Sequence, residues 1–200
     1  LVNKNRVGDV NLMQEFMESP DYDQYEGIVF DPANSQPEDV INTFYGLRGQ
    51  NLFESGVTPD QQGLHFMLKH LEGLCGDREG CTIDGTTVKQ YDVILDLLAF
   101  PIQNPGKKSN LALVVKGAQG CGKSIFFEDF MGKAVYGEQL YAMEEGKLPN
   151  FTGDLFEKLY VIIDELYKMN HKARQDIKRA ITLTRRKFND KHKKAFASND

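Results

Sequence analysis

The chain has no apolar run that approaches the ~20 residues of a membrane-spanning helix. Residues 1–6 are largely polar, so the start also lacks the apolar core of a secretory signal. The absence of an initiator methionine indicates a piece of a longer protein. These absences together predict a cytoplasmic protein that has no membrane partner.

Cysteine is scarce as well. Cys75, Cys81 and Cys121 do not have the spacing of a zinc site. Cys121 lies inside a glycine-rich segment that a disulfide would obstruct, so we expect free thiols in a reducing compartment. The sequence also has no internal repeats and no low-complexity tracts.

Positive charge is scarce at one end of the chain and abundant at the other. Residues 1–65 hold three Lys or Arg against eleven Asp or Glu, whereas residues 166–200 hold eleven against three. The formal net charge of −5 therefore hides a basic end that suits a polyanionic partner. The alternative is a basic surface that faces only solvent.

The length of 200 residues fits one large domain, or one domain with a smaller companion. The sequence of residues 1–105 predicts an acidic N-terminal segment followed by a small helical region. The turn at 104–108 is a candidate domain boundary. Residues 62–76 and 90–102 have the apolar spacing of amphipathic helices. Pro101 should end or kink the second, and residues 80–88 between them should form a short hairpin or an ordered loop.

Residues 106–200 alternate between strand and helix patterns, which predicts an α/β fold with a parallel sheet. The expected strands are 111–116, 140–143, 159–163 and 193–197, and the expected helices are 124–134 and 172–183.

The most specific motif fits G-x-x-x-x-G-K-[ST], the phosphate-binding loop of nucleoside triphosphatases. Its glycines let backbone N–H groups surround phosphate oxygens, and the following helix adds positive charge at its N-terminus. Lys123 would reach the β- and γ-phosphates, and the Ser124 hydroxyl would bind Mg²⁺. A glycine-rich turn between two core elements is the alternative, but it does not explain the lysine and the serine. The nucleotide-binding residues are Gly117, Ala118, Gln119, Gly120, Cys121, Gly122, Lys123 and Ser124.

A pair of acids follows the strand expected at 159–163. Ligands of open α/β sheets bind beyond the carboxyl ends of the strands. Asp164 would therefore hold Mg²⁺, and Glu165 would orient and deprotonate the attacking water. The alternative is two acids that simply open the next loop.

The end of the chain supplies two further candidates. Asn199 follows a short apolar strand and would hold the lytic water beside the γ-phosphate, although it could instead only cap the strand. Between the acids and Asn199, Asn189-Asp190 has turn chemistry and predicts a basic β-hairpin that contacts a sugar-phosphate backbone. Its candidate DNA-binding residues are Arg185, Arg186, Lys187, Lys191, His192 and Lys193.

The ordered motifs resemble those of superfamily 3 helicases, and more narrowly the helicase part of phage, plasmid and poxvirus-type primase–helicases. The core motifs are Gly-Ala-Gln-Gly-Cys-Gly-Lys-Ser, Val-Ile-Ile-Asp-Glu, the basic segment and Phe-Ala-Ser-Asn. The resemblance covers roughly residues 40–200, and residues 42–46, 103–108, 150–153 and 177–182 support the narrower match.

The resemblance implies an AAA+-like P-loop core that uses ATP and Mg²⁺ to move single-stranded DNA through a homo-oligomeric ring, usually a hexamer. It implies catalytic roles for Lys123, Glu165 and Asn199, a host cytoplasmic location and a primase domain upstream. It also implies an arginine finger downstream of Asn199, so the fragment itself should be weakly active.

Three other functions share parts of this pattern. A loader or remodelling ATPase of the AAA+ type would have the same nucleotide site but would not depend on the basic hairpin. A nucleotide-gated scaffold would bind DNA or a partner without hydrolysing the nucleotide. The intact pair Asp164 and Glu165 argues against this function. A metabolic P-loop kinase would need a lid with arginines, and the sequence shows no such pattern.

Overall fold

The computed structural model describes residues 18–19, 25–82, 84–148, 155–165 and 170–182, together with the backbone of four two-residue strands near the chain ends. The chain divides into two compact units, Leu1–Phe44 and Tyr45–Asp200. The domain boundary expected near residue 105 stays a prediction.

In its described residues the first unit consists mainly of short strands and turns, as its composition predicts. β1 (Arg6–Val7) pairs antiparallel with β2 (Val10–Asn11), and β3 (Gly27–Val29) pairs in parallel with β4 (Val40–Asn42). The Asp31 carboxylate accepts hydrogen bonds from the backbone N–H groups of Ala33 and Ser35. Burial by itself would raise the pKa of Asp31, but these bonds and that of the Ser35 hydroxyl outweigh it and lower the pKa. They stabilise the turn that follows β3.

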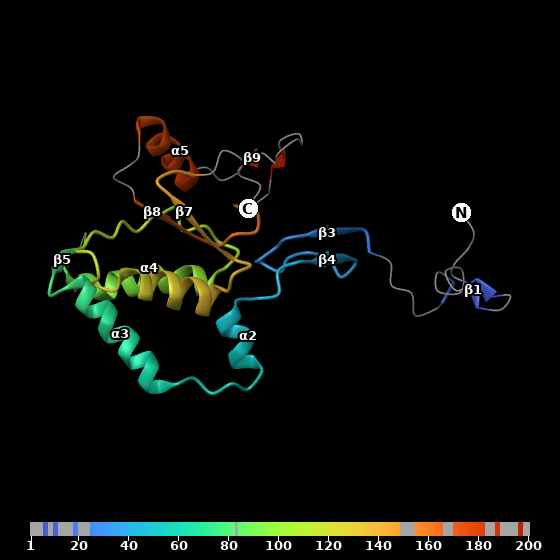
Figure 1. Ribbon diagram of the computed structural model, residues 1–200, viewed down its shortest axis with the longest axis horizontal. Coiled ribbons are helices and arrows are strands. Elements are labelled where there is room, and N and C mark those ends of the chain that lie inside the picture. Colours follow the sequence, from blue (N-terminus) through green and yellow to red (C-terminus); the bar gives the residue numbers. More distant parts are fainter. Residues whose placement is uncertain are drawn as a thin grey trace. The chain divides into compact units, whose positions relative to one another are not determined.

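The second unit is a mixed α/β arrangement whose elements follow one another along the chain (Figure 1). Its described elements are α2 (Arg48–Glu54), α3 (Gln61–Cys75), β5 (Glu79–Cys81), β6 (Thr87–Lys89), α4 (Gln90–Gln103), η1 (Ile125–Tyr136), β7 (Tyr141–Glu145), β8 (Tyr160–Asp164), α5 (His171–Thr182), β9 (Lys187–Phe188) and β10 (Phe196–Ala197).

The two amphipathic helices expected in the first half of the chain are confirmed as α3 and α4. The Asp60 side chain accepts a hydrogen bond from the Gln62 N–H and caps α3, and Gly76 ends that helix with a φ of 66°. The expected hairpin is also confirmed, because β5 pairs antiparallel with β6. Pro101 lies in the last turn of α4, which ends two residues later at Gln103. The proline thus acts close to the helix end, where few hydrogen bonds remain to be broken.

The helix expected after the glycine-rich loop is present, but its hydrogen-bonding pattern differs from that of an α-helix. Residues 125–136 form a π-helix, in which each N–H bonds to the carbonyl five residues earlier, as Gly137 does with Gly132 at 2.9 Å. Phe126, Met131 and Tyr136 are accordingly buried at intervals of five. The α-helical spacing used for the expectation places Ala134 on the buried face, whereas Ala134 is exposed.

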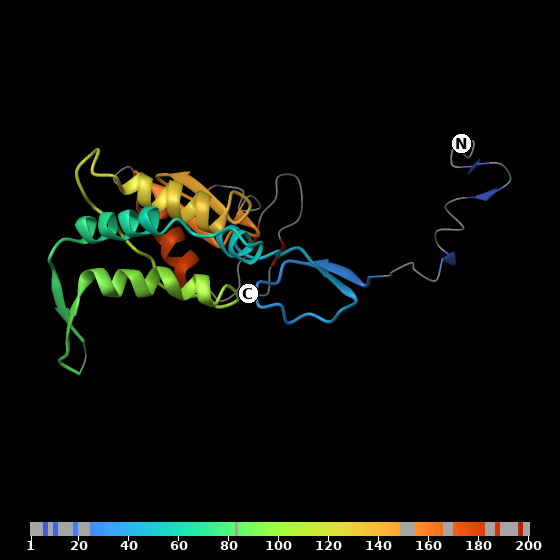
Figure 2. The same ribbon diagram turned by 90° about the horizontal axis from the view of Figure 1, so that it is seen from below.

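The helices α2 and α3 pack against η1. Figure 2 shows α3 lying between η1 and α4, and α3 contacts both helices. η1 also contacts α2 and the strands β7 and β8. A Cβ atom at Gly132 would come within 2.9 Å of the Tyr141 ring, so only glycine lets η1 approach β7 this closely.

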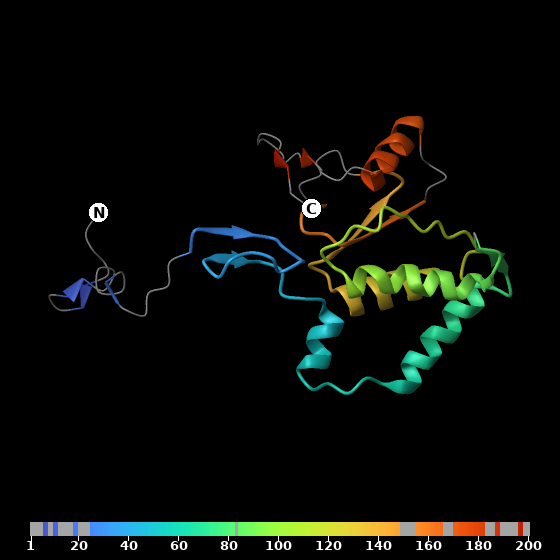
Figure 3. The same cartoon turned by 180° about the vertical axis from the view of Figure 1, so that it is seen from behind.

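The strands β7 and β8 form a parallel pair in which Tyr141 lies opposite Tyr160 and Glu145 opposite Asp164. Figure 3 shows this pair between α5 on one side and the helices η1 and α4 on the other. Tyr160 stacks on Tyr136 of η1 with ring centroids 4.8 Å apart. Burial raises the pKa of Tyr136 to about 12 and also raises the pKa of Tyr160, so both phenols stay neutral well above physiological pH. The first four residues of β8 are half-buried rather than fully buried, because each sheet in the described part of the chain has only two strands.

The prediction of a strand at residues 111–116 is wrong. Residues 111–118 carry no regular secondary structure, and Leu111 and Val114 are 63% and 72% exposed. A strand requires a hydrogen-bonding neighbour, and β7 and β8 pair with each other rather than with this segment. Residues 111–116 therefore have residue types that favour a strand, but no described strand forms hydrogen bonds with them.

The last predicted elements are described in part. α5 confirms the helix expected at 172–183, within one residue at each end. β9 pairs antiparallel with β10, with Phe188 opposite Phe196, which agrees with the predicted hairpin. The Lys108 ammonium donates a hydrogen bond of 3.0 Å to the carbonyl of Ala180 and joins the turn at 104–108 to the end of α5.

Tyr141 offers a test of this packing. Its hydroxyl is buried and has no hydrogen-bond partner among the residues that the structure describes, although the ring is tilted against Tyr160. We expect Tyr141→Phe to raise the free energy of unfolding by about 1 kcal/mol, because it removes an unsatisfied polar group and keeps the ring. Urea unfolding measures the change. Destabilisation by Tyr141→Phe would show that the hydroxyl is hydrogen-bonded in solution.

A search of the described helices finds none that is both long enough and apolar enough to cross a membrane.

Candidate functional site

The glycine-rich loop adopts the backbone conformation that its sequence requires. Gly120 and Gly122 have φ values of 78° and 86°, in the left-handed region that side-chain-bearing residues rarely adopt. Lys123 and Ser124 are the first helical residues, and Ser124 has αR geometry. The N–H groups at the start of this helix have no intrahelical acceptor and, with the helix dipole, favour an anion.

The Lys123 ammonium lies within this loop. Its Nζ atom is 3.1 Å from the carbonyl oxygen of Gly117, 2.8 Å from that of Ala118 and 3.4 Å from Sγ of Cys121. A Cβ atom on Gly117 would be 3.2 Å from the same Sγ, so the two ends of the loop lie close together. The structure thus places the carbonyl groups of Gly117 and Ala118 beside the Lys123 ammonium, and a phosphate-binding role for the loop stays a prediction.

His70 of α3 also contacts the loop, and the sequence reasoning missed it. Its Nε2 atom lies 3.0 Å from the carbonyl oxygen of Gly122. Because a carbonyl only accepts, Nε2 carries the proton of this hydrogen bond. No motif contains His70, which lies 52 residues before its partner, and a lone histidine on a helix gives no sequence signal of such a contact.

The acid pair lies at the carboxyl end of β8, as predicted. Asp164 is exposed, and its Oδ1 atom accepts a hydrogen bond of 2.7 Å from the N–H of Glu165. Glu165 has a φ of 53°, a left-handed conformation that is strained for a residue with a side chain. Backbone strain of this kind is typical of functional turns.

A third acid, Glu145, stands at the same edge of the sheet. It lies opposite Asp164 in the parallel register, so the carboxyl ends of β7 and β8 coincide. The expectation of a strand ending at residue 143 missed it, since the strand continues to Glu145. Because neighbouring parallel strands end at the same edge of a sheet, an acid at the end of β7 lies beside the acid at the end of β8.

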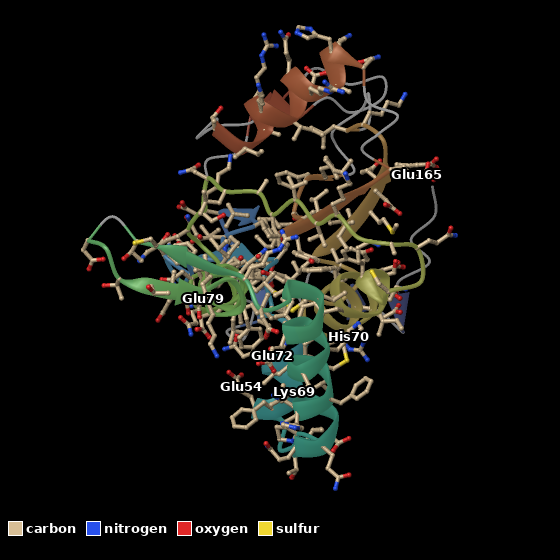
Figure 4. The ribbon with its side chains drawn as sticks, turned by 90° about the vertical axis from the view of Figure 1, so that its left-hand side faces the viewer. Glu54, Lys69, His70, Glu72, Glu79 and Glu165 are labelled. Carbon is tan, nitrogen blue, oxygen red and sulfur yellow. The ribbon has the colours of Figure 1, made fainter. Side chains whose placement is uncertain are left out.

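The loop and the acids are connected through η1, which begins immediately after Ser124 and contacts both strands. No ion pair joins Lys123 to Asp164 within the part of the chain that the structure describes. Figure 4 shows Glu165 at the end of its strand, with its side chain directed away from His70 and α3. The meeting of lysine and acids on one triphosphate stays a prediction.

The proposed Mg²⁺ ligands have suitable chemistry. A hydroxyl and a carboxylate supply the hard oxygen donors that Mg²⁺ prefers, together with waters and phosphate oxygens. Ser124 and Asp164 are both exposed and so accessible to a hydrated ion. Among the described residues, no group of three or more His, Cys, Asp or Glu is arranged to hold a metal by itself. The donor set therefore fits an ion that arrives with a nucleotide.

The basic end of the chain is described only in part. Asn199, Arg185, Arg186, Lys191, His192 and Lys193 lie outside the described residues, and Lys187 is described only through its backbone in β9. The pairing of β9 with β10 nevertheless agrees with the predicted hairpin. On α5, nitrogen-tipped side chains project outward (Figure 4), and its exposed cations are Lys172, Arg174, Lys178 and Arg179.

Comparison with known proteins adds one match. A model described as a family of unknown function (DUF5906) matches residues 115–200, which include the loop, the acid pair and the basic end. The match covers less than half of the chain. No curated protein and no solved structure matches the sequence.

Proposed function

We propose that this chain is an ATP-dependent helicase module of a replication protein of the phage, plasmid or virus type, built on a P-loop core. The observation that carries the proposal is the Lys123 ammonium, held inside a loop with left-handed glycines at the start of a helix. This arrangement suits a triphosphate, because it combines N–H donors, a helix dipole and a cation.

In this proposal, Lys123 exchanges the carbonyl oxygens of Gly117 and Ala118 for oxygens of the β- and γ-phosphates. Ser124 and Asp164 would hold Mg²⁺, which supplies neutralisation of the phosphate charge. Glu165 would accept the proton of the attacking water, and Asn199 would position that water. The exposed end of β8 leaves Asp164 accessible for this role.

The proposed nucleic-acid partner is single-stranded DNA. The hairpin formed by β9 and β10 and the cations of α5 come from the same basic end of the chain. Contacts from lysine and arginine to phosphates give affinity without sequence preference, which suits translocation. A homo-oligomeric ring, an upstream primase domain and a host cytoplasmic location belong to the same proposal and rest on the resemblance.

Equilibrium binding to this chain tests the nucleotide part, because binding does not require an assembled ring. A fluorescent ATP analogue with Mg²⁺ should bind, and unlabelled ATP should compete for the site. Failure of the chain to bind any nucleoside triphosphate would remove the proposal. For the longer protein, stimulation of ATP hydrolysis by single-stranded DNA would favour a helicase over a loader or a scaffold.

The DNA part is tested by charge reversal in the hairpin. We expect Lys191→Glu with Lys193→Glu to weaken binding of a labelled oligodeoxythymidine by about 10-fold or more and to lower the salt slope by about 1 for each phosphate that is no longer neutralised. Fluorescence anisotropy at several salt concentrations measures both quantities. Lys107→Glu with Lys147→Glu is the matched control, with the same charge change outside the basic end. Equal effects of the two pairs would indicate a general charge effect rather than a binding hairpin.

A further inference from the structure

His70 lies outside the glycine-rich motif, but its contact with the loop restrains the Gly122 carbonyl. The carbonyl of Gly122 accepts two hydrogen bonds, one of 3.0 Å from Nε2 of His70 and one of 3.2 Å from the N–H of Phe126 in the first helical turn. The first comes from α3 and the second from η1. One loop carbonyl is therefore held from two different elements.

The planarity of the peptide bond transmits this restraint. In a trans peptide, the carbonyl of Gly122 and the N–H of Lys123 point in opposite directions. A carbonyl held toward α3 therefore directs the N–H of Lys123 to the opposite side, away from His70. That N–H is one of the first-turn donors available to an anion, because the first N–H groups of a helix have no intrahelical acceptor.

Steric fit at the same contact excludes other residues from position 122. A Cβ atom on Gly122 would lie 2.4 Å from both Cε1 and Nε2 of His70, which is closer than any real contact. The φ of 86° already favours glycine there. The orientation of the histidine ring is supported by Phe66, whose ring is parallel to it within 3° one helical turn earlier.

We propose that His70 is a positioning residue for the nucleotide site, which holds the Gly122 carbonyl so that the loop N–H groups face the phosphates. This inference rests on the proposed function and goes beyond it, because it assigns part of the site to α3, outside the segment with the family match. It also makes α3 the element through which the helical region and the nucleotide would influence each other, since α3 packs against both α4 and η1.

The first test separates the hydrogen bond from the ring. His70→Phe keeps an aromatic ring against Phe66 but removes the donor, whereas His70→Gln keeps an N–H donor on a flexible chain. We expect His70→Phe to weaken binding of a fluorescent ATP analogue about 3- to 10-fold, the loss of one hydrogen bond, and His70→Gln to restore affinity to within about 2-fold of the parent. His65→Phe on the exposed side of the same helix is the matched control and should bind as the parent does.

The second test needs no nucleotide. Hydrogen–deuterium exchange of the peptide spanning 117–124 should be faster in His70→Phe than in the parent, in His65→Phe and in His70→Gln, because the loop loses a restraint. Thermal unfolding of each variant shows that the fold is retained. This readout concerns the loop itself, so it remains informative whether or not the chain binds a nucleotide.

The two measurements distinguish the failure of each proposal. If the parent binds Mg·ATP and His70→Phe matches it in affinity and in loop exchange, the positioning role is overturned while the nucleotide site stands. If the parent binds no nucleotide, the proposed function fails, and with it the role of His70 in nucleotide binding. Parental affinity in His70→Phe together with weakened binding in His70→Gln would assign the effect to ring packing and would also overturn the proposed hydrogen bond.

Discussion

Lys123→Ala is expected to weaken binding of Mg·ATP about 10- to 100-fold and to abolish ATP hydrolysis in the longer protein. A charge-assisted hydrogen bond contributes about 1.5–3 kcal/mol, and each 1.4 kcal/mol corresponds to a factor of about ten in affinity. The loss of hydrolysis should be larger, because the lysine also stabilises charge that develops on the phosphates during transfer. Competition with a fluorescent ATP analogue and release of inorganic phosphate measure the two effects.

The fold should tolerate this substitution. The carbonyl groups that Lys123 contacts belong to Gly117 and Ala118, which are exposed and can bond to water instead. Lys116→Ala is the matched control, since it removes an exposed lysine one residue before the loop. Lys123→Arg should also bind poorly, because a planar guanidinium does not replace a compact ammonium. Parental affinity in Lys123→Ala would mean that the amine does not reach the phosphates.

Glu165→Gln is expected to leave Mg·ATP affinity within about 2-fold of the parent and to lower the hydrolysis rate about 10²- to 10⁴-fold, the range for loss of a general base. The amide keeps the size of the side chain and its hydrogen-bonding capacity but cannot accept the proton of water. Comparison of single-turnover hydrolysis with equilibrium binding separates the two effects. The nucleotide complex should therefore accumulate.

Two neighbouring substitutions sharpen this prediction. Glu145→Gln changes the acid opposite Asp164 in the parallel register, and it should leave hydrolysis nearly unchanged. Loss of hydrolysis in Glu145→Gln instead of Glu165→Gln would move the base to β7. Glu165→Gly should be inactive yet more stable by about 1 kcal/mol, because glycine relieves the left-handed strain at a φ of 53°.

Local patterns predicted many elements correctly, because local chemistry determines them. The spacing of apolar residues was sufficient to predict α3. The run before Asp164 predicted β8, and the turn chemistry of residues 189–190 predicted the pairing of β9 with β10. The glycines of residues 117–124 predicted a turn before a helix, and that turn is present, whereas its role in phosphate binding stays a prediction.

The failures all concern contacts between distant residues. Residues 111–115 have the composition of a strand, but a strand exists only where a neighbour supplies hydrogen bonds, and β7 and β8 pair with each other. The register of η1 follows from burial of Phe126, Met131 and Tyr136, which the α-helical spacing does not reproduce. Glu145 joined the acidic edge through the parallel register, and that register cannot be read from either strand alone.

By itself the sequence determined the chemistry of the site: two left-handed glycines, an ammonium, a hydroxyl and a pair of acids follow from residue types and their spacing along one continuous segment. Only the tertiary structure decided which other groups surround them. The Gly122 carbonyl meets His70 because α3 packs on η1. Packing of this kind depends on side-chain shape across 52 residues of intervening chain, and no short motif records it.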